Sequence, residues 1–156
     1  MRINLTNLVR RHHSPDFLPY SDDALCHALD RVHEQWLKAR RQHDRFSIYK
    51  YLKAVFDLVM VWKKEKDETN RTKRALRLAK STLVVVEPFA AIIACTSSRK
   101  HVDSKARSKW ARVLMFCTEF KSSSEPLQHF IHRHGGLNQS AAEYSSRLGR
   151  HQTSGR

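Results

Sequence analysis

The stretch FSIYKYLKAVFDLVMVW, residues 46–62, decides the fold class because it is apolar on nearly all sides and contains neither Gly nor Pro. Its β-branched and aromatic residues favour a strand weakly. Its length exceeds that of a usual strand, however, and the charged residues Lys50, Lys53 and Asp57 interrupt it, so we interpret it as a helix. The segment predicts an all-α protein in which this helix is central and buried.

Residues typical of helix N-termini, together with apolar residues at helical spacing, predict helices on both sides of this segment. Ser21 is a suitable N-cap for an amphipathic helix over residues 22–42, and Asp103 is a suitable N-cap for a second one. Pro88 fits the first turn of a short apolar helix that ends at the polar stretch 96–100. All three helices belong to the expected compact domain.

Two segments between these helices are less regular. Residues 63–80 are highly charged, and we expect a bend near Thr69 and Asn70 followed by a helical piece from Arg71 to Lys80. Residues 83–86 form a four-residue apolar run. Such a run indicates either a short strand or an extended connection, and we favour the connection.

The C-terminal part predicts two helices joined by a tight turn. Ser124 is the expected N-cap, Pro126 lies early in the first helix, and Gly135 and Gly136 form the turn before a helix over residues 137–148. This hairpin is similar to a DNA-binding helix-turn-helix, whose second helix enters the major groove. Any two helices joined by Gly-Gly give the same pattern, so an ordinary helical hairpin is the alternative.

The expected architecture is one compact helical domain of about five or six helices over residues 21–148. Pro15 and Pro19 and the lack of apolar periodicity predict a flexible basic arm over residues 1–20. Residues 149–156 contain no apolar side chain, and we expect a disordered tail there.

The charge balance is the main indication of function. The chain of 156 residues has 29 Lys and Arg against 15 Asp and Glu, which gives a formal net charge of +14. Most of the surplus lies in the middle: residues 46–86 carry 10 basic and 4 acidic side chains, and residues 87–124 carry 7 and 3. Two basic helices ending on the same side would form a cationic surface that neutralises several phosphates.

We therefore expect a nucleic-acid-binding protein that is not an enzyme, with DNA in preference to RNA as the ligand. The residues expected to contact phosphates are Lys73, Arg74, Arg77, Lys80, Lys105, Arg107, Lys109 and Arg112. The residues expected to reach base edges from the C-terminal hairpin are Asn138, Gln139 and Arg147. The alternative is an adaptor or inhibitor whose cationic face binds an acidic partner protein, and a solvated helix face is the usual fate of a charge run.

No sequence signal indicates catalysis or a cofactor. The common phosphate-binding, dinucleotide-binding, metalloprotease and hydrolase motifs are all missing from the sequence, although scattered carboxylates leave a nuclease possible. His129 and His132 share a helix face and His134 lies close by, but no further ligand is evident at zinc-site spacing. We expect neither a metal nor a cofactor.

The remaining features concern packing and location. Cys26, Cys95 and Cys117 lie far apart among apolar neighbours and are expected to be buried thiols, and the three Trp residues are expected in the core. No segment is long and apolar enough for a membrane span, and the N-terminus lacks signal-peptide features, so a cytoplasmic protein is expected. A half-exposed helix over residues 46–62 would allow a homodimer, whereas its full burial would not require one.

Three stretches carry a resemblance to known sequences. They are EPFAAIIACTSS (residues 87–98), VDSKARSKWARVLMFCTEF (residues 102–120) and EPLQHFIHRHGGLNQSAAEYSSRLGR (residues 125–150). Together they resemble a group of small basic proteins of unassigned function from rhizobial and related alphaproteobacterial genomes. The resemblance implies a bacterial cytoplasmic setting, compatible with a plasmid or mobile element, and it transfers no functional residues.

Overall fold

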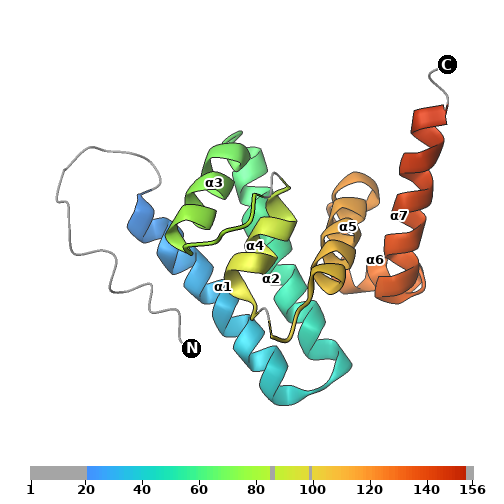
Figure 1. Cartoon of the computed structure of the whole chain (residues 1–156). Coiled ribbons are helices and arrows are strands. Elements are labelled where there is room, and N and C mark those ends of the chain that lie inside the picture. The colour runs from blue at the N-terminus through green and yellow to red at the C-terminus, as the bar shows by residue number, and fades with distance from the viewer. Residues whose placement is uncertain (1–20, 85–86, 99, 154–156) are drawn as a thin grey trace.

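The computed structural model describes residues 21–84, 87–98 and 100–153, and over these ranges it contains seven helices and no strand (Figure 1). The all-α prediction is confirmed, and the number of helices is slightly higher than the expected five or six. The helices are α1 (Asp22–Gln42), α2 (Arg45–Lys64), α3 (Glu68–Leu78), α4 (Pro88–Thr96), α5 (Ser104–Phe120), α6 (Leu127–Arg133) and α7 (Gly136–Thr153). The predicted arm over residues 1–20 lies outside the described residues.

Side-chain caps fix the starts of the long helices. The Ser21 hydroxyl accepts a hydrogen bond from the Ala24 amide at 3.2 Å, which confirms the predicted N-cap of α1. The Asp44 carboxylate accepts from the Ser47 amide at 2.7 Å and starts α2 only two residues after α1 ends. His43 closes α1 with a φ of 50°. The short connection makes α1 and α2 an antiparallel hairpin.

The bend between α2 and α3 lies earlier than predicted. Lys66 has a φ of 56°, and the Asp67 amide donates back to the Trp62 carbonyl at 3.1 Å. This is the hydrogen bond of a Schellman motif, which ends a helix at a left-handed residue. Thr69 and Asn70 therefore lie inside α3 instead of at the bend. The sequence concealed the motif because Lys, and not Gly, occupies the left-handed position.

The C-terminal hairpin and the segment before α4 also differ in detail from the prediction. Helix α6 starts after Pro126, which is its extended N-cap residue, so Ser124 does not cap it. Gly135 and Gly136 form the predicted turn with φ values of 81° and 90°. Helix α7 continues through Thr153, so the first residues of the expected disordered tail are helical. Residues 81–84 have no regular structure, and residues 85–86 of the possible strand lie outside the described residues.

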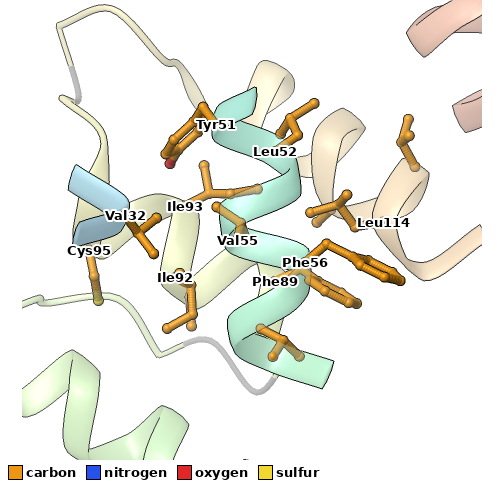
Figure 2. Packing of buried hydrophobic residues seen from close by; sticks show 14 of the residues in the cluster. Val32, Tyr51, Leu52, Val55, Phe56, Phe89, Ile92, Ile93, Cys95 and Leu114 are labelled. Atoms are coloured by element: carbon orange, nitrogen blue, oxygen red, sulfur yellow. The ribbon is translucent and has the colours of Figure 1, made fainter. Parts of the chain in front are cut away.

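The core is centred on α2 and α4. Helix α4 contacts α1, α2, α3 and α5, and α2 contacts every other helix except α7 in the principal packing of the described chain. Figure 2 shows Ile92 and Ile93 of α4 between side chains of α1 and α2. The Phe56 and Phe89 rings stack with centroids 6.0 Å apart. The prediction of a buried central helix is confirmed, although Phe46 at its start remains 60% exposed.

The Trp and Cys residues belong to this core. Trp36 and Trp62 are buried, and the Trp110 ring lies 6.4 Å from that of Trp36. All three cysteines are free and buried, as predicted. Burial raises the pKa of both the Cys95 and Cys117 thiols to about 12. These thiols are therefore protonated packing groups at neutral pH.

None of the helices in the described ranges is both long enough and apolar enough to cross a bilayer.

The central position of α4 gives a direct stability prediction. Ile92 is fully buried, so Ile92→Ala should lower the free energy of unfolding by about 3 kcal/mol through lost burial and cavity formation. Val84→Ala is the matched control, because the Val84 side chain is 97% exposed and its truncation should change the free energy very little. Denaturant unfolding followed by circular dichroism measures both. Equal effects of the two substitutions would contradict the placement of α4.

Candidate nucleic-acid interface

Helix α4 separates the two groups of basic residues that the sequence places at the interface. Helix α4 packs against both α3 and α5 and lies between them (Figure 1). Its sequence, PFAAIIACT, contains no charged residue. Lys73, Arg74, Arg77 and Lys80 therefore lie on one side of α4, around α3, and Lys105, Arg107, Lys109 and Arg112 lie on the other, on α5.

The group at α3 is partly neutralised by α1. Arg74 donates to the Asp22 carboxylate from Nη2 at 2.6 Å and from Nε at 3.0 Å, and its side chain is only 18% exposed. Arg77 Nη2 lies 3.6 Å from the same carboxylate. Lys73 and Lys80 are exposed. Arg74 therefore fastens α3 to the start of α1, and the positive charge of this group is reduced.

Helix α5 carries a row of basic side chains whose charges are not cancelled in this way. The row consists of Lys105, Lys109 and Arg112, which share one face because they are spaced by four and three residues. Lys109 Nζ donates to Asn138 Oδ1 at 2.9 Å, and Arg112 Nη1 donates to Ser145 Oγ at 2.8 Å. Both acceptors are neutral. We call these three residues the basic row.

The basic row lines an open depression of about 620 Å³. The lining residues are Asp103, Ser104, Lys105, Ala106, Ser108, Lys109 and Arg112. One of them is acidic: Asp103 caps α5 and accepts from the Ala106 amide at 2.7 Å. The shape and charge fit a segment of an extended anionic ligand better than an enclosed small molecule. Arg107, two positions after Lys105, is rotated by about 200° around the helix and lies away from the row.

Helix α7 runs beside α5 in the same direction. Asn138, near the start of α7, bonds to Lys109, and Arg147, near its end, lies 4.5 Å above the Phe120 ring at the end of α5. Ala141 and Tyr144 of α7 are buried. The structure thus places Asn138 beside the basic row.

The three predicted base-reading residues do not share one environment. Asn138 and Gln139 are exposed near the start of α7. Arg147 lies about 13 Å further along the helix and donates to Glu143 from Nη2 at 2.6 Å. With its guanidinium also above Phe120, Arg147 has a packing role. Helices α6 and α7 are joined by the predicted turn at Gly135 and Gly136 and form a helical hairpin.

The histidines of the hairpin have other partners. His134 Nδ1 lies 2.9 Å from Glu143 Oε2, and its ring centroid lies 4.9 Å from that of Phe116. His129 and His132 are exposed. Within the described ranges, no three His, Cys, Asp or Glu side chains are grouped to hold a metal ion.

Two residues of this basic surface, Asp103 and Ser145, were not predicted to belong to it. Asp103 was predictable as a helix cap, but its place among the basic side chains depends on the surface around it. The Ser145 hydroxyl accepts a hydrogen bond from the Arg112 guanidinium, although the two residues are 33 positions apart in the sequence. No local sequence pattern indicates such a partner.

Comparisons with known proteins add no identity. No family model matches the chain, and no curated protein or solved structure matches it.

The pairing of Glu143 with Arg147 predicts a pH-dependent contribution to stability. The hydrogen bond from Arg147, together with His134, holds the pKa of Glu143 below its ordinary value. A lowered pKa in the folded state gives stability that is fully present above the ordinary value of about 4.3 and is lost as the pH falls through the lower, folded-state value. Glu143→Gln should therefore be less stable than the unmodified chain at pH 7, with the difference shrinking below about pH 4. Thermal unfolding across this range measures it, and an unchanged difference at pH 3 would contradict it.

Proposed function

We propose that this protein binds nucleic acid through the basic row on α5, without catalysing a reaction. The supporting observation is that Lys105, Lys109 and Arg112 share an exposed depression whose lining contains a single acidic residue, Asp103, so that a positive surplus remains. Other basic groups of the described chain, such as Arg74, already pair with carboxylates of their own.

The length of the row suits a nucleic-acid backbone. Arg112 follows Lys105 by seven positions, which corresponds to about 10 Å along the helix axis. With α5 parallel to the duplex axis, along which successive phosphates of one strand rise about 3.4 Å, the row would extend over about three phosphate steps. Its contacts would fix position without reading sequence.

The residues beside the row favour duplex DNA over RNA. Asn138 is held next to Lys109, and Gln139 follows it on the same exposed end of α7. Asn and Gln amides pair with adenine edges in the wide major groove of B-DNA. The major groove of an RNA helix is too narrow and deep for such side chains. Base contacts from Arg147 are not part of the proposal, because its guanidinium is committed to Glu143.

An acidic partner protein is the alternative ligand, because its negative charges would also bind to this basic surface. The two ligands differ in how salt affects them, since a duplex releases condensed counterions and a protein surface does not. A steep salt dependence with duplex DNA supports the proposal. An absence of binding to all nucleic acids at low salt would overturn it in favour of the acidic partner.

Removal of the basic row should weaken binding in a graded way. Lys105→Ala, Lys109→Ala and Arg112→Ala should each weaken binding to duplexes of unrelated sequence by a similar factor. Each should also reduce the slope of log affinity against log salt by about 1. Fluorescence anisotropy with duplex DNA, single-stranded DNA and RNA, from about 50 to 200 mM salt, provides the measurement. Lys73→Ala removes the same charge on the other side of α4, and an equal effect from it would contradict the assignment to α5.

Asp103, the acidic residue that lines the depression, gives a test in which the affinity for DNA should increase. Asp103→Asn keeps a good helix cap but removes the negative charge, so DNA affinity should rise while stability is retained. Asp103→Ala should raise affinity similarly but lower the free energy of unfolding by about 1 kcal/mol. Anisotropy and denaturant unfolding separate the two effects. A loss of affinity in Asp103→Asn would contradict the proposed ligand charge.

A further inference from the structure

Helix α1 has no net charge in a chain whose net charge is +14. With His counted as neutral, it contains four acidic and four basic side chains, and the two kinds are segregated along its 21 residues. The acidic residues lie between Asp22 and Glu34, and three of the basic ones lie between Lys38 and Arg41. The first half is mainly acidic, with Asp22 already paired with Arg74, and the second half is mainly basic, so the helix is complementary to an antiparallel copy of itself.

An apolar groove follows α1 where it meets α2. Its volume is about 320 Å³, and its floor consists of small and aliphatic side chains. The lining residues are Ala28, Arg31, Val32 and Gln35 of α1, and Ala54, Asp57, Leu58 and Val61 of α2. Val61 is 47% exposed. Small residues allow another helix to approach closely, and such a helix would remove this apolar surface from water.

The groove is centred on the helix. Its α1 wall spans residues 28–35, and the middle of α1 is Val32. A two-fold axis between Val32 and His33, half a residue from this middle, would place Arg31 of one copy opposite Glu34 of the other. Both side chains are exposed, and neither forms an ion pair within the described ranges. Asp30 and Glu34 are four residues apart and repel each other within one helix, which an opposite charge from a second copy would relieve.

We infer that the protein forms a two-fold symmetric dimer through α1 and this groove, with the two α1 helices antiparallel. The interface is isologous, so the contact between Arg31 and Glu34 is made twice. It brings two strongly basic chains together at a helix without net charge. The apolar groove provides the hydrophobic contribution, and the segregated charges fix the antiparallel direction and the register.

Charge reversal of the full chain tests this surface. Arg31→Glu and Glu34→Arg should each weaken the dimer at least about tenfold in dissociation constant, because both symmetric contacts become like-charged. Mixing the two variants should restore association as a heterodimer, since each chain then meets the opposite charge at both contacts. Sedimentation equilibrium at physiological salt measures all three samples.

A charge reversal on another helix and a measurement of folding are the two controls. Lys73→Glu applies the same charge change as Arg31→Glu on exposed α3 and should leave the dimer unchanged, and circular dichroism should show that all variants are folded. A monomeric unmodified chain at about 100 μM would overturn the inference. A dimer that resists both reversals, or reversals that mixing does not rescue, would overturn this surface as its interface.

Discussion

The burial of α4 is the constraint on which the rest of the structure depends. This nine-residue helix is too short to be stable alone in water, so packing must hold it. Its isoleucines are buried between α1 and α2, while its sides contact α3 and α5. A helix with no charge in the middle of a basic protein also forces the charged helices to its outside. The position of α4 therefore determines where each basic group reaches the surface.

Local signals in the sequence were sufficient for most of the fold. Ser21 and Asp103 have side chains that cap the next turn of the chain, so their effect does not depend on distant residues. The α2–α3 bend could not be located in this way. Lys66 adopts a left-handed conformation that its residue type does not favour, so no glycine marks the end of α2 in the sequence.

The candidate site was less predictable because residue type does not reveal long-range partners. Arg74 and Arg147 look like Arg112 in the sequence, yet the first two bond to carboxylates and the third to a serine. Asp22, which neutralises Arg74, is 52 residues away along the chain. Such pairings arise only when the helices are packed, and they decide which positive charges are cancelled and which are not.

The uneven charge distribution separates ligand binding from assembly. The segments containing α3 and α5 carry most of the surplus, whereas α1 has none. Helix α1 packs mainly on α2, α3 and α4, and α5 packs mainly on α4 and α7. A dimer through α1 would thus leave both copies of the basic row exposed, and each row would displace condensed counterions from a duplex that it binds. Two linked rows strengthen binding only where one duplex can reach both, so the angle between the paired α1 helices would set the affinity.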